Sequence, residues 1–454
     1  MLPGFFDGDD TWKIRFSPTV EGKWSFVTRS DITDLDGKRM ELLCTPNKTR
    51  NVHGGLLIDQ VHSRHFVYED GTRYFMMGYE CDWLWALDSL SDRNYALDKF
   101  LSKLAANGFN NIIMNSYAHD TAWRVGNTDP DDYGPPPFYA WEGTNEVPNH
   151  SRFNLKYWKH YDKVIESLNR HGITAHIMIK VYNKMVNWPR KGSPEDDLFF
   201  RWMIARYAAY PNVHWDLSKE ANNEPDVMYK TDRLRFIRAN DPYHRLVTVH
   251  DDRATYDKGV YAQLADYRSD QQHSDWSVSM AEHRMQKEWP IVNVEFGYEH
   301  GPGGIKDVTY NVSTQPKELC RRAWEICMAG GYTAYYYTYT AWDVVRPADT
   351  PPGYAYFRRL RSFFDTIPYW RMIPTNDLVD RGQCLADPGK TYVVLLSESQ
   401  PLSLNIRDTR ESLKAEWLQP FTGARISAGH IGPGKIKLDP PKAWGDGPIV
   451  LHVY

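Results

Sequence analysis

The sequence has no apolar run near the roughly 20 residues that cross a membrane, and no run of basic residues. It therefore predicts neither a membrane-bound protein nor a nucleic-acid-binding one. Cysteine is scarce, with 5 in 454 residues, and there is no CxxC or HxH pair, so we expect no zinc site. Cys320 and Cys327 fall on one predicted helix about 10 Å apart, too far to bridge, and are expected to be buried free thiols.

Repeats, low-complexity tracts and a signal-peptide pattern are absent as well. As it stands, the sequence predicts a cytoplasmic protein, or a periplasmic or secreted one if a signal peptide has been removed. What the chain does have is length and apolar content. Its 454 residues, 42% of them hydrophobic, can form a barrel of about 250 residues together with smaller modules.

The pattern of apolar residues changes twice along the chain. Residues 1–68 alternate apolar and polar positions and predict an N-terminal β module, part of a β-sandwich. Residues 69–370 alternate short apolar runs with amphipathic helices, which favours a closed (β/α)8 TIM barrel in the α/β class. Residues 371–454 return to short strands with Gly and Pro turns and predict a small C-terminal β-sandwich. The expected barrel strands are 74–78, 111–115, 173–179, 213–217, 245–250, 261–267, 291–295 and 333–338.

Two glutamates stand at the ends of expected barrel strands. Glu220 follows the fourth strand, and Glu295 ends the seventh. Because the carboxyl ends of parallel barrel strands form the mouth of the barrel, we expect both side chains to lie there. Two carboxylates facing one sugar are what cleavage of a glycosidic bond requires.

These strand ends resemble a known superfamily. The stretch Ala209-Tyr-Pro-Asn-Val-His-Trp-Asp-Leu-Ser-Lys-Glu220 resembles the fourth-strand signature of the retaining glycoside hydrolases of clan A, the cellulase-like TIM barrels. Ile291-Val-Asn-Val-Glu295-Phe-Gly is similar to the seventh strand of that clan, and Thr338-Tyr-Thr-Ala-Trp342 to the eighth. The resemblance implies that Glu220 is the acid/base, that Glu295 is the nucleophile and that Trp342 floors the sugar site.

The overall layout is similar to the apiosidase-like bacterial barrels. These have an N-terminal β module, which Phe5-Phe-Asp-Gly-Asp-Asp-Thr-Trp-Lys-Ile-Arg-Phe16 resembles, and a C-terminal sandwich of the collagen-binding type. One position departs from the clan, because Lys219 stands where Asn usually binds the sugar 2-hydroxyl. A lysine can donate the same hydrogen bond, but its charge lowers the pKa of a close Glu220.

A second glutamate competes for the acid/base role. Asn223-Glu224-Pro225 spells the Asn-Glu-Pro of the clan literally, four residues later. The register of the strand favours Glu220, since it puts Glu224 past the barrel mouth in the following loop; a short motif match is a hypothesis only.

Further candidates for substrate binding are polar residues near strand ends and aromatic residues in loops, where rings can stack on sugars. They are Glu80, Asp82, Asn115, His119, His250, Gln272, His273, Trp123 and Trp141. The sequence therefore predicts a retaining hydrolase that cleaves a β-type glycosidic bond of a carbohydrate by double displacement, without a metal or an organic cofactor. The alternative is a non-catalytic carbohydrate-binding or adhesin-like protein on a degenerate barrel, since Lys219 indicates altered chemistry.

Overall fold

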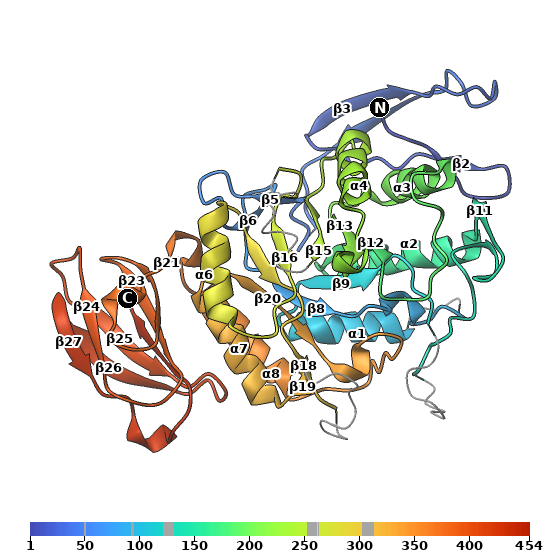
Figure 1. Ribbon diagram of the computed structural model, residues 1–454. Coiled ribbons are helices and arrows are strands. Elements are labelled where there is room, and N and C mark those ends of the chain that lie inside the picture. The colour runs from blue at the N-terminus through green and yellow to red at the C-terminus, as the bar shows by residue number, and fades with distance from the viewer. Residues whose placement is uncertain (50, 92–94, 121–130, 252–260, 262, 302–312) are drawn as a thin grey trace.

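A closed parallel sheet forms the centre of the protein (Figure 1). The computed structural model describes residues 1–454 except 50, 92–94, 121–130, 252–260, 262 and 302–312. The strand order of the sheet is β14-β13-β12-β9-β8-β20-β17-β16-β15. Its two end strands, β14 (Val247–Thr248) and β15 (His250–Asp251), are separated by Val249 alone. They occupy one position, so the sheet closes into a barrel of eight strand positions, as predicted. The other strands are β8 (Met77–Glu80), β9 (Asn111–Asn115), β12 (Thr174–Val181), β13 (Val213–Lys219), β16 (Arg268–Asp270), β17 (Ile291–Asn293) and β20 (Tyr332–Tyr336).

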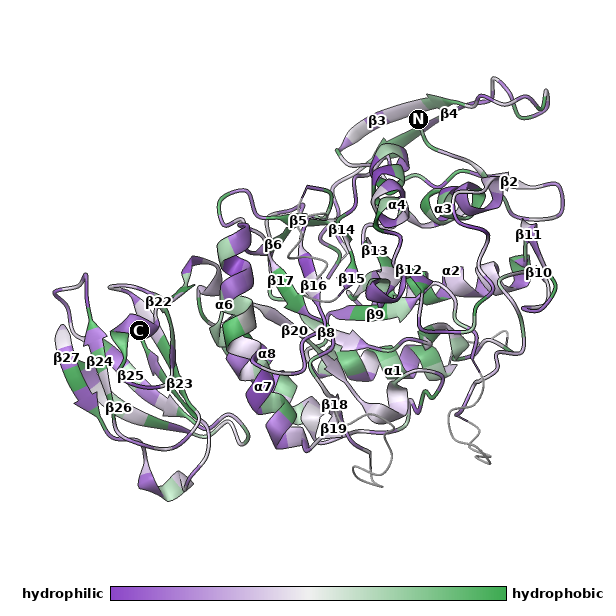
Figure 2. Cartoon of the chain, in the orientation of Figure 1, coloured by the Kyte–Doolittle hydropathy of each residue, from purple (hydrophilic) through white to green (hydrophobic). Residues whose placement is uncertain are grey.

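Amphipathic helices surround the barrel, and Figure 2 shows hydrophobic and hydrophilic residues on each of them. They are α1 (Tyr95–Ala106), α2 (Leu155–Arg170), α3 (Pro194–Tyr207), α4 (Val227–Asn240), α6 (Trp276–Gln286), α7 (Pro316–Met328) and α8 (Gly353–Asp365). In α1, the residues Leu97, Phe100, Leu101 and Leu104 are fully buried, because spacings of three and four place them on one face. Cys320 and Cys327 are buried free thiols on α7, as predicted.

The sixth strand is the one whose predicted position is wrong. The prediction was 261–267, whereas β16 begins at Arg268. Its three residues, Arg268, Ser269 and Asp270, are polar yet fully buried. Arg268 Nε donates to Asp270 Oδ1 at 2.6 Å. Because buried polar pairs replace apolar side chains here, no hydrophobic run marks the strand.

The described N-terminal residues do not form the predicted sandwich. They make three separate antiparallel sheets. Some of their apolar side chains pack on the barrel, whereas others contact one another, as Phe16 and Trp24 do at 5.0 Å, or are exposed. Phe5 lies 5.9 Å from Trp202 of α3, and Phe66 lies 5.4 Å from Tyr332 of β20, measured between ring centroids. The sheets are β1 (Phe5–Phe6) with β2 (Trp12–Lys13), β3 (Gly22–Val27) with β4 (Arg39–Cys44), and β5 (Leu56–Ile58) with β6 (Phe66–Tyr68) and β7 (Arg73–Tyr74).

The C-terminal strands form a separate module beside the barrel (Figure 1). A six-stranded antiparallel sheet and the pair β24-β27 enclose one core that includes Leu404, Trp417 and Leu451. Two sheets around a shared core match the predicted C-terminal sandwich; the boundaries proposed at 68 and 370 stay predictions. The strands are β21 (Ile373–Pro374), β22 (Gln383–Asp387), β23 (Thr391–Leu396), β24 (Leu402–Ile406), β25 (Leu413–Leu418), β26 (Arg425–Ile431), β27 (Gly434–Leu438) and β28 (Ile449–Val453).

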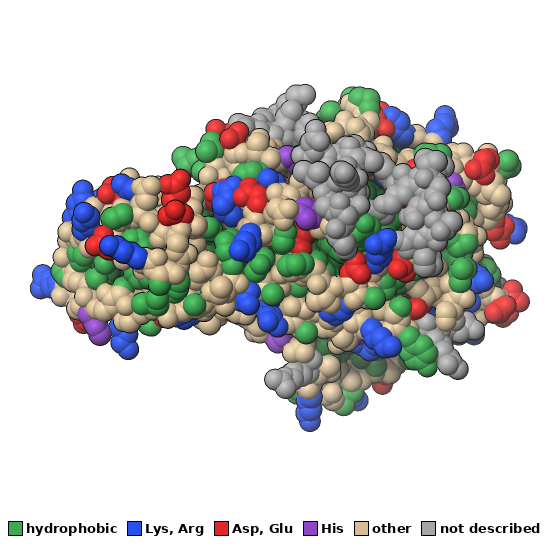
Figure 3. Space-filling model, turned by 90° about the horizontal axis from the view of Figure 1, so that it is seen from below, with side chains coloured by type: hydrophobic (Ala, Val, Ile, Leu, Met, Phe, Trp, Pro, Cys, Tyr) green, Lys and Arg blue, Asp and Glu red, His purple; other side chains and the backbone are tan. Residues whose placement is uncertain are grey.

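The surface agrees with the small net charge of −4. On the face in Figure 3, acidic and basic side chains are interspersed, without a large patch of either sign among the residues drawn in colour. Among the described residues, every helix is too short or too polar to span a bilayer.

Candidate active site

The structure places both predicted catalytic glutamates at the carboxyl ends of barrel strands. Glu220 directly follows β13, and Glu295 comes two residues after β17. Glu220 has a left-handed backbone, with φ at 47°, and ends the strand where the short helix η2 (Ala221–Asn223) begins. A positive φ is uncommon for a residue other than glycine, and such strain concentrates at functional sites.

Glu295 lies in a buried, cation-rich environment. Its Oε1 accepts a hydrogen bond from the Tyr298 hydroxyl. Its Oε2 lies 3.4 Å from Lys219 Nζ and 3.6 Å from His250 Nε2. Burial alone would raise the pKa of Glu295, but Lys219, His250 and the Tyr298 hydrogen bond outweigh it and lower that pKa below its usual value. Glu295 is therefore an ionised carboxylate at neutral pH.

The pKa of Glu220 is shifted in the opposite direction. Glu220 is part-buried, and its two oxygens accept hydrogen bonds from Asn183 Nδ2 at 2.7 Å and Asn223 Nδ2 at 2.8 Å. Burial and then the charge of Glu295 raise the pKa of Glu220, against the opposing charge of Lys219. The two carboxyl groups therefore differ, since Glu220 keeps its proton at a pH where Glu295 is ionised. Carboxyl pairs with diverging pKa values are typical of an acid beside a nucleophile.

Glu224 is placed differently. Its Oε1 accepts from Lys191 Nζ at 2.8 Å and from the backbone N of Asp226 at 2.9 Å. It follows η2, past the end of the strand, as the register predicted. Glu220, in contrast, lies close enough to Glu295 for the charge of Glu295 to raise its pKa, which favours Glu220 as the acid/base.

Lys219 is fully buried among carboxylates. Its Nζ contacts Glu80 Oε1, and lies 3.3 Å from Asp82 Oδ1 and 3.4 Å from Glu295 Oε2. Burial alone would lower the pKa of Lys219, but Asp82, Glu295 and Glu80 hold it well above its usual value. Burial raises the pKa of Glu80 well above its usual value, although Lys219 opposes this. Lys219 is therefore the fixed cation of the site.

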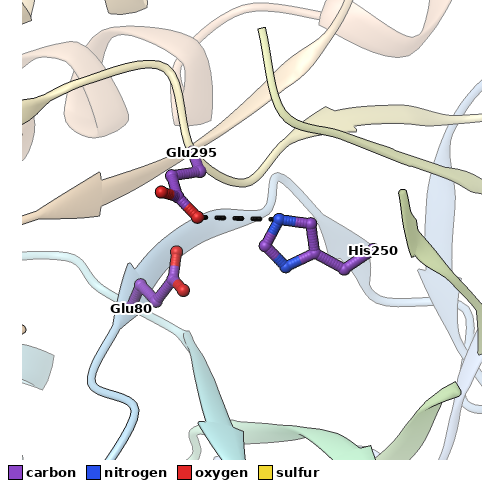
Figure 4. A group of neighbouring side chains, drawn as sticks. All are labelled: Glu80, His250 and Glu295. Carbon is purple, nitrogen blue, oxygen red and sulfur yellow. Dashed lines mark ion pairs between the residues drawn. The ribbon is translucent and has the colours of Figure 1, made fainter. Parts of the chain in front are cut away.

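Glu80, His250 and Glu295 point toward one another at the barrel mouth (Figure 4). Their ligand atoms all lie within 4.8 Å of one another, close enough to share a metal ion. Lys219 already contacts both of these carboxylates. Because its ammonium supplies the positive charge there, the geometry favours Lys219 over a divalent ion.

Several further candidates lie at the carboxyl ends of barrel strands. Asn115 and His250 are fully buried, and in the described part of the chain their side-chain polar atoms have no hydrogen-bond partner. Burial and Lys219 lower the pKa of His250 to about 4, so it is neutral at pH 7. The ring of Trp342 lies 5.5 Å from that of Tyr298. Asn115 ends β9, His250 begins β15 and Trp342 follows β20.

Other candidates are less well placed. The backbone O of Gln272 accepts a hydrogen bond from Asn293 Nδ2 at 3.1 Å, so the backbone of Gln272 is bound to β17. The next residue, His273, is exposed. Among the described residues, the ring of His119 contacts the Tyr117 hydroxyl at 3.5 Å, and neither Glu220 nor Glu295. Trp123 lies outside the described residues.

The prediction that Trp141 is an exposed sugar platform is wrong. Trp141 begins β10 (Trp141–Gly143), which pairs with β11 (Pro148–Phe153), and its side chain is fully buried. Its ring packs against Tyr139 at 5.2 Å and Phe199 at 5.1 Å. The loop hairpin folds back on the helices, so this aromatic side chain serves the core.

Trp141→Ala is therefore expected to lower stability without altering substrate binding. Loss of a buried Trp typically costs about 3–5 kcal/mol. Denaturant unfolding measures that cost, and KM of the folded variant should equal that of the wild type. A raised KM at unchanged stability would restore Trp141 as a sugar contact.

Sequence reasoning missed the contacts of four side chains, three of which bond Glu220 or Glu295 and one of which bonds Asp82. Tyr298, which begins β18 (Tyr298–Glu299, paired with β19, Ser313–Thr314), bonds Glu295, and Tyr336 donates to Asp82 Oδ2 at 2.6 Å. Asn183 and Asn223 hold Glu220. The only local signals were the spacing of three from Glu295 to Tyr298 and the Asn within Asn-Glu-Pro.

Known proteins share this architecture. A candidate glycoside hydrolase from Bacteroides vulgatus ATCC 8482 superposes with a TM-score of 0.81 at 20% identity, covering 99% of this chain and 91% of that one. A glycoside hydrolase of family 5 from the same organism gives a TM-score of 0.67 at 17% identity, covering 88% and 93%. At these identities the likeness shows the fold alone. No protein of curated function matches the chain.

Family models match two parts of the chain. Residues 1–31 match a domain of unknown function, DUF5060. Residues 60–393 match the model described as "Apiosidase-like, catalytic domain", which spans the whole barrel. This match confirms the resemblance to the apiosidase-like barrels that the layout of the chain predicted. The chain belongs to the apiosidase-like family of catalytic domains.

Proposed function

We propose that this protein is a retaining glycoside hydrolase that cleaves a β-type glycosidic bond by double displacement. The observation that carries the proposal is the pair of opposite pKa shifts at the ends of β13 and β17. The pKa of Glu220 is raised and that of Glu295 is lowered. Cleavage of a glycosidic bond by two carboxyl groups needs this division of roles. The choice of double displacement follows the resemblance of the two strand ends to the retaining hydrolases of clan A.

In the first step, the Glu295 carboxylate attacks the anomeric carbon of the bound sugar. Glu220 donates its proton to the departing oxygen as the glycosidic bond breaks. The aglycone leaves as an alcohol, and the sugar remains as an ester on Glu295. Lys219 and Tyr298, which contact Glu295, hold its carboxylate in place for the attack.

In the second step, water replaces the aglycone. Esterification removes the negative charge of Glu295, which is one of the causes that raise the pKa of Glu220. Glu220 is then a better carboxylate base, so it takes a proton from the water as the water oxygen attacks the anomeric carbon. The product keeps the anomeric configuration of the substrate, and both glutamates return to their starting states.

The sugar would be held by groups with free hydrogen-bonding capacity. The amide of Asn115 and both ring nitrogens of His250 are buried without partners, and an unpaired buried polar group is costly unless a ligand satisfies it. Sugar hydroxyls both donate and accept hydrogen bonds, so they suit these atoms. Trp342 offers an aromatic side chain beside them.

The test is hydrolysis of a panel of aryl glycosides, with apiosides included because of the family to which the chain belongs. Proton NMR would follow the first anomer released. We expect turnover of at least one β-type substrate with retention. An inverted product would overturn double displacement. Calorimetric binding of glycans without turnover would favour the non-catalytic alternative.

A further inference from the structure

Among the described residues, three carboxylates surround the ammonium of Lys219. They are Glu80, Asp82 at 3.3 Å and Glu295 at 3.4 Å from Nζ. The contacts to Glu80 and Glu295 are hydrogen bonds, and the contact to Asp82 is an ion pair. The side chain is fully buried, so its charge is balanced by these carboxylates.

The neighbours of Lys219 have unused hydrogen-bonding capacity. Among the residues that the structure describes, Glu80 Oε2 is buried without a hydrogen-bond partner, as are both side-chain amide atoms of Asn115. The backbone N of Asn115 donates to the backbone O of Asp82 at 3.0 Å. This bond keeps the side-chain amide of Asn115 next to the three carboxylates. A hydroxyl entering the site would therefore meet free atoms on Asn115 and Glu80 before it could displace a carboxylate from Lys219.

We propose that Lys219 is a positioning residue for the nucleophile Glu295 and not a sugar ligand. Its ammonium is the fixed counter-ion that holds Glu80, Asp82 and Glu295 together. This inference rests on the proposed hydrolase function and assigns Lys219 a role different from that of the clan asparagine at the same strand position. Other groups of this protein then bind the sugar 2-hydroxyl that the clan asparagine binds.

The charges of these four side chains explain the arrangement. Three buried carboxylates without a cation would repel one another, and each would resist ionisation. One ammonium in contact with all three keeps Glu295 ionised and directs its Oε2. An asparagine is neutral and could not keep Glu295 ionised. Glu80 and Asp82, at the end of the first barrel strand, require a cation beside them. Lys219 and these two acids thus form one unit.

The first test uses Lys219→Met, which keeps the length of the side chain and removes its charge. Activity is measured on a cleaved aryl glycoside and on its monodeoxy analogues. If Lys219 binds a sugar hydroxyl, its substitution should cost less on the analogue that lacks that hydroxyl. If Lys219 positions Glu295, the substitution should cost the same on every analogue. We expect the same fold-loss in kcat/KM on every analogue. A loss that shrinks at least tenfold on one of them would overturn the proposal.

The pH profile gives a second readout. Lys219 lowers the pKa of Glu295, so removing it should move the acidic limb of kcat/KM to higher pH, by about 1–3 units. Lys219→Arg keeps the charge and should keep the limb near its wild-type position. The matched control is Lys180→Met, which removes another buried lysine, bonded to Asp196 at 2.6 Å. It should cost stability without moving the limb.

A third readout does not depend on activity. Without the ammonium, the pKa of Glu295 is no longer held down, and that of Glu80, which is already raised, rises further. The resulting penalty is full above the raised folded-state values, shrinks as the pH falls through them, and is gone only below the unfolded-state values. We expect Tm of Lys219→Met to fall by roughly 5 °C at pH 7, and by less at pH 4.

Adding Glu80→Gln should recover part of the Tm loss, because it removes one carboxylate from the cluster. A Tm deficit that is the same at both pH values, with no recovery in the double variant, would contradict the counter-ion role. This comparison remains decisive if no glycoside is cleaved, so failure of the hydrolase proposal and failure of this inference are separate results.

Discussion

Glu295→Gln is expected to fold normally and to lose nearly all turnover, with kcat reduced by about 10⁴-fold or more. The amide cannot attack the anomeric carbon, and loss of a nucleophile costs rates of this order in enzymes that use one. Steady-state kinetics on the best aryl glycoside measures the loss. Thermal unfolding checks that the variant is folded.

The matched control is Glu224→Gln. Glu224 is held by Lys191 and the backbone of Asp226, so its loss should leave the rate within a few-fold of the wild type. Near-normal turnover by Glu295→Gln would refute the nucleophile assignment. Any residual activity should have a basic limb at lower pH, because the charge of Glu295 no longer raises the pKa of Glu220.

Glu220→Ala is expected to slow substrates with poor leaving groups by about 10²–10⁴-fold. An activated aryl glycoside needs little protonation, so its first step should be nearly unaffected. The glycosyl–enzyme should then accumulate, since no base activates water. Pre-steady-state kinetics would show a burst of released phenol.

Added azide should restore part of the rate of Glu220→Ala, because this anion needs no base and fits the space left by the carboxylate. The product should be a glycosyl azide of retained configuration, detectable by mass spectrometry. If Glu224→Ala gave the burst and the azide product while Glu220→Ala did not, the fourth-strand register would be wrong.

The barrel strands show which parts of the fold can be predicted from the sequence. Asn111–Asn115 was predicted as a strand and is β9 with the same bounds, because its signals are local: a short apolar run with a helical pattern on either side. The same reasoning failed at β16, where Arg268 and Asp270 are buried as a pair. A buried ion pair looks like a polar loop in the sequence.

The aromatic residues show a second limit. Trp141 was predicted from its place in a loop, and Trp342 from the resemblance of the eighth strand to clan A. Trp141 packs into the core against Phe199, whereas Trp342 lies beside Tyr298, which bonds Glu295. The loop pattern could not reveal that Trp141 is a core residue, because its burial depends on which distant helix the loop folds onto.

The sequence by itself determined the barrel and the strand ends that carry Glu220 and Glu295, since periodicity and strand order are properties of neighbouring residues. Only the tertiary structure decided the role of Lys219. Its partners Glu80 and Glu295 lie 139 and 76 residues away along the chain. Closure of the barrel brings them to one ammonium, and the charge they share there sets which carboxylates are ionised.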